Sequence, residues 1–271
     1  MSIESIRSHY GFSRAPFAKN IPPQALYGYR GHAEATARIS YCISEKMIGV
    51  VTGECGSGKT VAARAVISGL DASRYTTVYL GTPGVGLRGL YASIVTALGG
   101  VPCFYHASLV PQTTGLIAAE HEQRGKSVVL VCDEAQLYDA ETLEGLRCLS
   151  NDGMDAESRF SLILLGQPTL RRRLRLGCLA ALDQRVGLRY QVAPLDLAEC
   201  ASYIACHLRL AGRSDTLFSD DAVGLIHQVS RGLPRMVNNL CVQSLVATFS
   251  AGKAIVDESA ARAAVAEVAA E

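Results

Sequence analysis

The stretch GECGSGKT at 53–60 constrains this chain more than any other, because it directly follows the apolar run MIGVVT at 47–52. That run predicts a buried strand, and residues 60–70 predict the helix after the loop. Glycines let a loop turn successive backbone N–H groups inward, which makes an anion-binding nest at a helix N-terminus. The pattern G-x-x-x-x-G-K-[ST] between a strand and a helix therefore predicts a phosphate-binding loop, with an ordinary tight turn as the alternative.

The side chains of this loop predict Mg-ATP as the ligand. We expect Lys59 to reach the β- and γ-phosphates of ATP and Thr60 to bind Mg²⁺. Cys55 is expected to be tolerated in the loop without a catalytic part. The residues expected to contact the nucleotide are Gly53, Glu54, Cys55, Gly56, Ser57, Gly58, Lys59, Thr60 and Val61.

An acidic pair supplies the second half of such a site. Asp133 and Glu134 directly follow the apolar run VVLVC at 128–132. We expect Asp133 to lie beside the metal as a ligand, and Glu134 to orient and polarise the water that attacks the γ-phosphate. The alternative is that the two acids cap the helix that starts near Asp139.

Three further polar residues are candidates for contact with the γ-phosphate. Gln167 follows an apolar strand, so its amide is expected between the acidic pair and the nucleotide. Arg235, in RGLPR, is expected to act on the nucleotide of its own subunit. Arg185, in ALDQRVGLRY, is expected to reach the nucleotide of a neighbouring subunit as an arginine finger. The alternative for either arginine is a surface position in a salt bridge.

Alternating strand and helix patterns predict an α/β fold around these motifs. The strands are apolar on both faces, which is typical of a parallel sheet sandwiched between helices. The expected strands are 47–52, 76–81, 127–132 and 160–166, and the expected helices are 32–45, 60–70, 87–98, 112–124 and 139–150.

Composition and pattern divide the chain into three parts. Residues 1–30 contain prolines and aromatic residues and are expected to form an arm laid over the core. Residues 31–194 form the predicted nucleotide-binding domain. Residues 195–271 have helical periodicity, with Asp196 and Glu199 spaced as a capping-box variant, and predict a small all-α lid domain.

Two basic segments raise the question of nucleic acid. In LRRRLRL at 170–176 the leucines are four apart, so we favour the solvated face of an amphipathic helix over direct phosphate contact. The loop TPGVGLRG at 82–89 carries glycines and Arg88 near the carboxyl edge of the sheet, where open α/β sheets bind ligands. Arg88 is the candidate DNA contact, and a plain connecting loop is the alternative.

Charge and composition exclude several classes of protein. The chain has 26 Lys and Arg against 25 Asp and Glu, a net charge of +1, so any DNA binding must be local. Its nine cysteines show no CxxC pairing, which argues against a disulfide framework or zinc site and favours the reduced cytoplasm. The sequence contains no run of about 18 apolar residues, so it predicts no membrane-spanning helix.

The order of these motifs resembles a known family. YGFSRAPF, GECGSGKT, VVLVCDEAQ, LLGQP, LDQR and GLPR together resemble the AAA+ ATPases of the ExeA and TnsC/TniB group, most nearly the ATP-binding subunits of insertion elements. The resemblance makes Lys59 and Thr60 Walker A residues and Asp133 and Glu134 the Walker B pair. It places Gln167 at the sensor 1 position, Arg185 at the arginine-finger position and Arg235 at the sensor 2 position.

The resemblance also implies function and partners. Such a protein binds and hydrolyses Mg-ATP, forms a homo-oligomeric ring or helical filament on non-specific double-stranded DNA, and recruits or activates a DDE transposase while selecting target DNA. The secretion-pathway members carry a membrane segment and a peptidoglycan-binding region after the ATPase, whereas this sequence ends after the lid, so secretion is not expected. The alternatives are a protein-remodelling or secretion-associated scaffold ATPase that acts without DNA, and a replication-initiator or clamp-loader-like switch.

Overall fold

The computed structural model describes residues 3–18, 20–151 and 158–269. Contacts divide the chain into two units, one of 1–33, 56–58 and 193–271 and the other of 34–55 and 59–192. Each unit buries hydrophobic clusters of its own.

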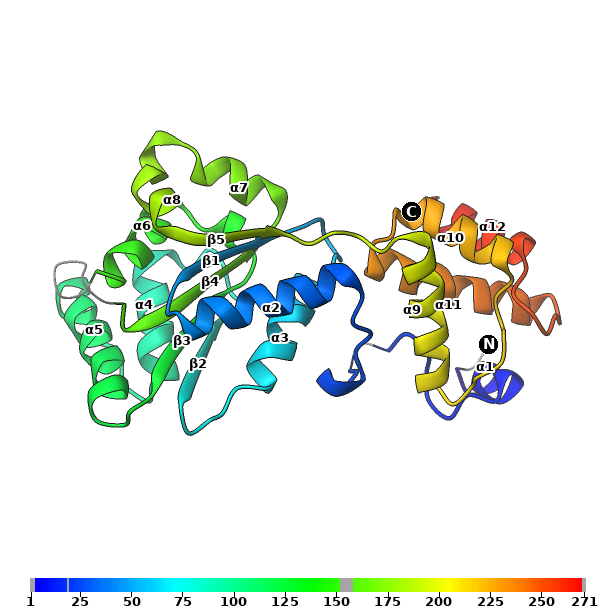
Figure 1. Ribbon diagram of the computed structural model, residues 1–271, viewed down its shortest axis with the longest axis horizontal. Coiled ribbons are helices and arrows are strands. Elements are labelled where there is room, and N and C mark those ends of the chain that lie inside the picture. Colours follow the sequence, from blue (N-terminus) through cyan, green and yellow to red (C-terminus); the bar gives the residue numbers. More distant parts are fainter. Residues whose placement is uncertain (1–2, 19, 152–157, 270–271) are drawn as a thin grey trace. The chain divides into compact units, whose positions relative to one another are not determined.

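The second unit is built on a five-stranded sheet in which every strand pair is parallel (Figure 1). The strand order is β2-β3-β4-β1-β5. The strands are β1 (Ile48–Thr52), β2 (Tyr75–Leu80), β3 (Ser127–Cys132), β4 (Phe160–Gly166) and β5 (Val186–Gln191). The helices of this part of the chain are α2 (Arg30–Ser44), α3 (Lys59–Ser68), α4 (Gly86–Ala97), α5 (His106–Glu122), α6 (Ala140–Leu149), α7 (Pro168–Leu174) and α8 (Ala180–Arg185), with short 3-10 turns η2 (Ala135–Leu137) and η4 (Gly177–Leu179).

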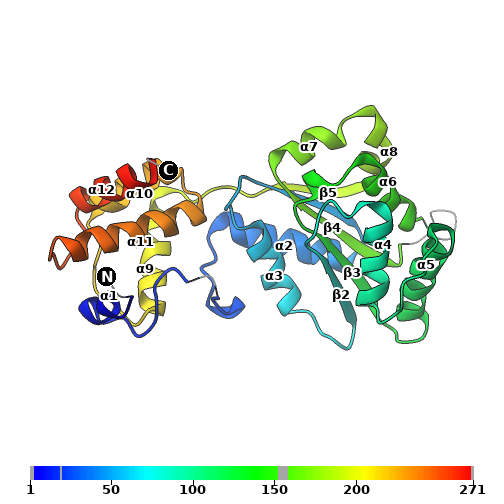
Figure 2. The same cartoon turned by 180° about the vertical axis from the view of Figure 1, so that it is seen from behind.

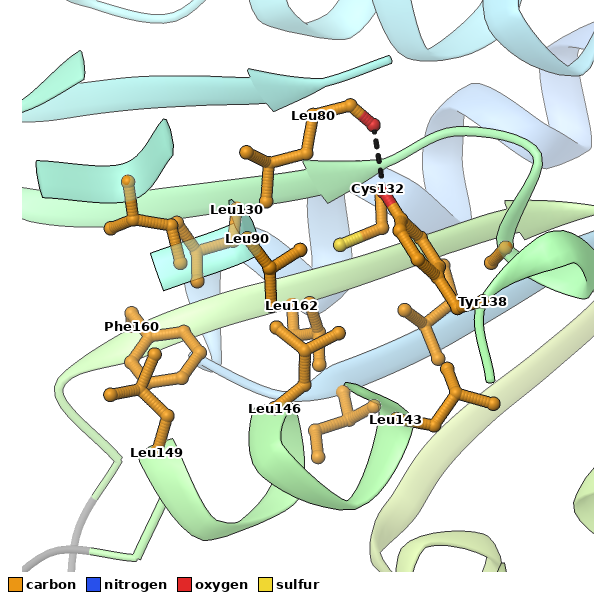
Figure 3. Packing of buried hydrophobic residues seen from close by; sticks show 14 of the residues in the cluster. Leu80, Leu90, Leu130, Cys132, Tyr138, Leu143, Leu146, Leu149, Phe160 and Leu162 are labelled. Atoms are coloured by element: carbon orange, nitrogen blue, oxygen red, sulfur yellow. Dashed lines mark hydrogen bonds between the residues drawn. The ribbon is translucent and has the colours of Figure 1, made fainter. Parts of the chain in front are cut away.

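Helices cover both faces of the sheet, as the apolar strands predict (Figure 2). Residues of β3 alternate between the two faces, so that Leu130 packs toward α4, α5 and α6 while Val129 packs toward α2 and α3. Figure 3 shows the first of these faces, where Leu143 and Leu146 of α6 lie against Leu162 of β4. The expected sandwich of a parallel sheet between helices is confirmed.

The register of the sheet brings the motifs to one edge. Thr52 at the end of β1 pairs with Gly166 at the end of β4, and Cys132 at the end of β3 pairs with Leu80 at the end of β2. Because all strands run in one direction, the glycine loop and the acidic pair leave the sheet at the same edge.

The first unit is a helical bundle with its own buried core. Its helices are α1 (Ile3–Tyr10), η1 (Pro23–Ala25), α9 (Leu197–Leu210), α10 (Asp220–Ser230), α11 (Pro234–Ser250) and α12 (Glu258–Ala269). Asp196 and Glu199 form the expected capping box at the start of α9.

The N-terminal segment differs from its expected place over the α/β core. Tyr10, Phe12, Phe17 and Tyr29 are buried in the cluster formed with α9, α10 and α11. The Tyr10 hydroxyl also donates to the Leu245 carbonyl at 2.9 Å. The aromatic residues of this segment therefore complete the core of the helical bundle, whose helices alone offer few large aromatic side chains.

Two elements of the second unit differ from the sequence-based prediction: one strand is not predicted, and one helix begins earlier than predicted. β5 was not predicted, because it is an edge strand that pairs only with β1 and exposes Gly187, Arg189 and Gln191. α5 begins at His106, six residues before the predicted start at 112, because the helix continues through Pro111.

Candidate functional site

The glycine loop adopts backbone conformations that its glycines make possible. Gly56 and Gly58 have φ of 80° and 91°, in the left-handed region that side chains disfavour. A Cβ on Gly56 would lie 2.5 Å from Cβ of Arg235, which belongs to the same unit. The Ser57 hydroxyl is buried without a hydrogen-bond partner. A loop with glycine-only dihedrals and an unsatisfied buried hydroxyl fits a phosphate ligand and argues against an ordinary turn.

Lys59 lies inside this loop at the N-terminus of α3. The side chain is 6% exposed, and its ammonium donates to the carbonyls of Gly53 at 2.8 Å and Glu54 at 2.9 Å. Charged acceptors form stronger hydrogen bonds to ammonium than neutral carbonyls do, so a phosphate oxygen suits this buried cation. Cys55 and Glu54 are exposed at the same loop.

Asp133 joins the loop to the neighbouring strands. Its Oδ2 accepts hydrogen bonds from Thr60 Oγ1 at 2.9 Å and from the Tyr79 hydroxyl at 2.8 Å, and its Oδ1 accepts from Glu134 N at 2.9 Å. Asp139 caps α6 by accepting from Thr142 N at 2.7 Å, so the alternative role of Asp133 and Glu134 as caps of that helix is wrong.

Tyr79, on β2, is a part of the site that sequence reasoning missed. Tyr79 is 54% exposed, yet desolvation of its hydroxyl and the hydrogen bond to Asp133 raise its pKa to about 12, which keeps the phenol a hydrogen-bond donor to the carboxylate. The sequence marks this residue only as an interruption of the apolar pattern in YTTVYL, which does not identify its partner.

Glu134 has an unusual backbone conformation, and its side chain is bound by Gln136, a second residue of the site that the sequence did not predict. Its φ of 50° and ψ of 38° are left-handed, which is uncommon outside glycine. Gln136 Nε2 donates to Glu134 Oε2 at 2.6 Å, while Gln136 Oε1 accepts from Gln167 N at 2.9 Å. Gln136, rather than the amide of Gln167, therefore contacts the acidic pair; Gln167 takes part through its backbone as the N-cap of α7.

The part of the chain that contains this arrangement matches a known protein family. Residues 42–174, which include the loop, the acidic pair and Gln167, match the family model described as an AAA domain. The chain carries an AAA-family P-loop ATPase domain.

Comparison with whole proteins finds a relative that matches most of this chain. The chain is 30% identical over 251 residues to the General secretion pathway protein A of Aeromonas hydrophila. That match covers 90% of this chain and 45% of the relative, so the chain spans less than half of the relative's length.

Solved structures show the same fold. The Aeropyrum pernix ORC2 protein in its ADPNP–ADP complexes has a TM-score of 0.68 at 20% identity, covering 93% of this chain and 70% of that one. The Drosophila ORC bound to DNA has a TM-score of 0.69 at 18% identity, covering 98% and 66%. At these identities the likeness establishes a P-loop NTPase fold for the chain.

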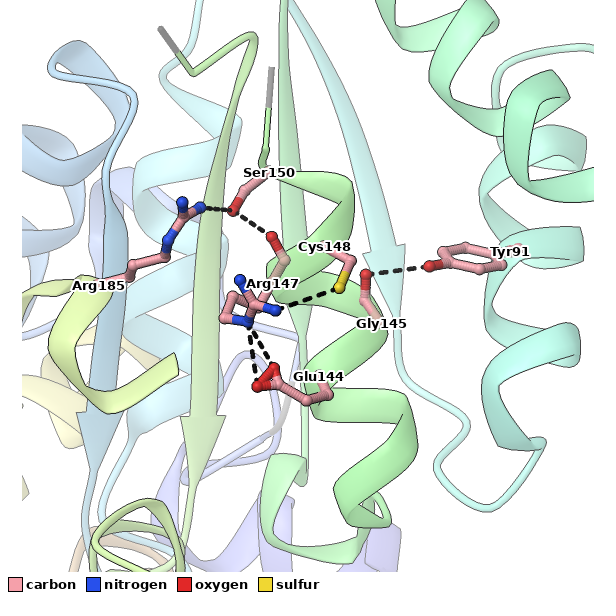
Figure 4. Close-up of polar contacts among 7 residues, drawn as sticks. All are labelled: Tyr91, Glu144, Gly145, Arg147, Cys148, Ser150 and Arg185. Carbon is pink, nitrogen blue, oxygen red and sulfur yellow. Dashed lines mark hydrogen bonds and ion pairs between the residues drawn. The ribbon is translucent and has the colours of Figure 1, made fainter. Parts of the chain in front are cut away.

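Arg185 lies beyond the residues matched by the AAA model; it ends α8 and contacts the residue that follows α6 (Figure 4). Its Nη1 donates to Ser150 Oγ at 3.1 Å, and that hydroxyl donates to the Arg147 carbonyl at 2.7 Å. Arg147 is itself ion-paired with Glu144. The role of Arg185 toward a neighbouring subunit stays a prediction.

Two other arginines make contacts that the sequence did not indicate. Arg88 is in the first turn of α4, within the predicted helix 87–98 that overlaps the loop 82–89, and its Nε donates to the Phe104 carbonyl at 3.0 Å, with the guanidinium 5.3 Å from the ring centroid. Arg173 of α7 donates to the carbonyls of Gln136 and Tyr138, so this arginine is structural and not part of a solvated face.

The rest of α7 agrees with the amphipathic prediction. Leu170 and Leu174 are buried, at 0% and 1% exposure, while Arg171 and Arg172 are exposed. Arg235 is the second residue of α11, after Pro234, and its backbone N–H donates to the Gly56 carbonyl at 3.2 Å within the first unit.

The donor set of this AAA domain fits magnesium on nucleotide rather than a metal held by protein alone. Within residues 3–18, 20–151 and 158–269, no group of three or more His, Cys, Asp or Glu side chains could hold a metal ion. Mg²⁺ in nucleotide sites needs only one or two protein oxygens beside the phosphates, and Thr60 Oγ1 and Asp133 Oδ2 are two oxygens that lie 2.9 Å apart. Among the described helices, none combines the length and the apolar character that a membrane span requires.

Proposed function

We propose that this AAA domain binds and hydrolyses Mg-ATP at the edge of the sheet that carries Lys59, Thr60, Asp133 and Glu134. The observation that carries the proposal is the hydrogen bond of 2.9 Å between Thr60 Oγ1 and Asp133 Oδ2, which joins the glycine loop after β1 to the acidic pair after β3. Two oxygen ligands from different motifs converge there, beside a buried lysine.

Each side chain has a distinct task in the proposed reaction. Lys59 and the loop N–H groups bind the β- and γ-phosphates, and Thr60 and Asp133 are the protein ligands for Mg²⁺. The metal supplies neutralisation of the charge on those phosphates when it is bound. Glu134 accepts a proton from the water that attacks the γ-phosphorus, in line with the departing ADP oxygen. Gln167 and Arg235 are proposed to read the γ-phosphate from the same subunit.

We further propose that ATP drives homo-oligomerisation on double-stranded DNA and that the oligomer regulates a transposase. The motif order of the chain supports this reading, and one structure of similar fold is an ORC bound to DNA. With a net charge of +1, the proposed DNA surface must be a local group of basic residues.

The experiment is to measure retention of random double-stranded DNA by the purified protein with ATP, with ADP and without nucleotide, at two salt concentrations. We expect ATP-dependent retention that weakens steeply with salt. Retention that does not depend on nucleotide would contradict the proposal that ATP controls DNA binding.

A scaffold ATPase that acts without DNA is the second candidate, because a relative at 30% identity is named a general secretion pathway protein. Electron microscopy of the protein with a slowly hydrolysed ATP analogue, with and without duplex DNA, separates the two. Filaments or rings that require DNA favour the transposition ATPase, and identical assemblies in both samples favour the scaffold. We place either function in the cytoplasm, which the nine free cysteines support.

A further inference from the structure

We propose that Gln136 is a positioning residue that fixes the carboxylate of Glu134 and ties it to the end of β4. The inference rests on the proposed ATP hydrolysis, in which Glu134 acts on the attacking water. One side-chain amide of Gln136 contacts Glu134 Oε2 at 2.6 Å and Gln167 N at 2.9 Å. The acid, Gln136 and the first residue after β4 thus form a continuous hydrogen-bonded chain.

The partners of Gln136 dictate how its amide is oriented. The backbone N–H of Gln167 can only donate, so it requires the carbonyl oxygen of the amide. The ionised carboxylate of Glu134 can only accept, so it requires the NH₂ group. A flipped amide would lose both hydrogen bonds, and therefore a single orientation satisfies the site.

The position of Gln136 is itself restrained on several sides. Its carbonyl, and that of Tyr138, accept hydrogen bonds from Arg173 of α7. Gly166 leaves room for the amide, because a Cβ at that position would lie 2.9 Å from Gln136 Oε1. The turn η2 and its side chain are thus held by α7 and by the last residue of β4.

Glu134 needs such a partner because its backbone contacts do not orient its carboxylate. Asp133 Oδ1 fixes the Glu134 N–H, and Leu137 N donates to the Glu134 carbonyl at 2.8 Å, which determines the left-handed backbone. The side chain still has three rotatable bonds beyond that backbone, and a charge-assisted hydrogen bond to Gln136 selects among its rotamers. If Gln167, the proposed γ-phosphate contact, moved, the amide of Gln136 would move with it and would displace the carboxylate of Glu134.

Two substitutions distinguish the contact of Gln136 with Glu134 from its contact with Gln167. Gln136→Glu is nearly isosteric and keeps an acceptor for Gln167 N, but it removes the donor to Glu134 and places a second carboxylate beside it. Gln136→Ala removes both contacts. Gln123→Glu, at an exposed position after α5, is the matched control for the added charge.

The measurement is kcat and KM for ATP, with nucleotide affinity determined separately. We expect both Gln136 variants to lower kcat by about 10- to 100-fold, the range for loss of a hydrogen bond to a charged group, with KM changed less than about twofold. A merely structural role would lower nucleotide affinity or stability together with kcat, whereas loss of positioning lowers kcat and leaves KM and nucleotide affinity nearly unchanged.

The inference is overturned if Gln136→Glu binds ATP normally and has the kcat of the wild type and of Gln123→Glu. Failure of the proposed function has another signature, in which the wild type hydrolyses no ATP or Glu134→Gln hydrolyses it at the wild-type rate. If Gln136→Ala does not fold, the isosteric Gln136→Glu decides the question alone.

Discussion

Thr60 Oγ1 lies 2.9 Å from Asp133 Oδ2, although 73 residues separate them in the chain. The contact exists because β1 and β3 are parallel and both are neighbours of β4, so their carboxyl ends meet at one edge of the sheet. It brings a hydroxyl and a carboxylate together in the manner that magnesium nucleotide sites require.

Thr60→Val should therefore weaken the binding of Mg²⁺ at the site without disturbing the shape of α3. Valine has the shape of threonine without the hydroxyl, so we expect the Mg²⁺ concentration for half-maximal ATPase activity to rise about 10-fold or more. Thr60→Ser keeps the hydroxyl and is the control. Equal magnesium dependence in the two variants would remove Thr60 from the metal site.

Arg185→Ala should lower ATP hydrolysis only where subunits associate. An arginine finger acts on the nucleotide of a neighbour, and its typical effect is about 10³- to 10⁵-fold in rate. ATPase activity measured over a dilution series should show a loss at high protein concentration and none at high dilution. The exposed, ion-paired Arg124 provides the control substitution. A loss of the same size at every concentration would mean that Arg185 acts within its own subunit or on stability.

Arg88→Ala tests the predicted DNA contact now that Arg88 is known to lie on α4 against Phe104. If its guanidinium leaves Phe104 to contact a phosphate, the slope of log K against log salt should fall by about one in the variant. Arg262→Ala, at an exposed position of α12, should leave the slope unchanged. An unchanged slope in Arg88→Ala would exclude this residue as a phosphate contact.

His207 should make the helical bundle less stable in acid. Burial, with a smaller contribution from Arg14, lowers the pKa of His207 from 6.5 to about 4. Between these values the unfolded chain binds a proton that the folded chain does not, so stability falls as pH falls. From pH 7.5 to 5.5 the free energy of unfolding should drop by about 1.4 kcal/mol from this residue.

Urea unfolding of the wild type and of His207→Gln at the two pH values checks this expectation. Glutamine does not titrate, so the variant should lack that part of the pH dependence. The same pH dependence in both proteins would mean that His207 titrates normally. Phe17, whose ring stacks on His207 at 5.1 Å, is part of the packing that keeps water from the imidazole.

The sequence predicted the parts of the fold and site that depend on local pattern. The glycine loop, the acidic pair and the helical capping box each occupy a short stretch, and the apolar runs mark the three inner strands, β1, β3 and β4, and the edge strand β2. Tyr79 and Gln136 could not be found this way, because their roles depend on the register of neighbouring strands and on a turn after β3.

The remaining differences have the same origin. β5 is an edge strand whose exposed polar residues conceal its strand pattern. Arg173 has the sequence context of a solvated arginine, yet two carbonyls of the turn after β3 come within its reach. Among the aromatic residues before residue 30, Tyr10 contacts Leu245, 235 residues further along the chain, which no local pattern could indicate.

The measurement that tests the central claim most directly is calorimetric titration of ATP, with and without Mg²⁺, into the wild type, Lys59→Ala and Glu134→Gln. We predict Mg-dependent binding to the wild type and to Glu134→Gln, no binding to Lys59→Ala, and hydrolysis by the wild type alone. Binding of ATP by Lys59→Ala with wild-type affinity, or the absence of binding by the wild type, would contradict the account.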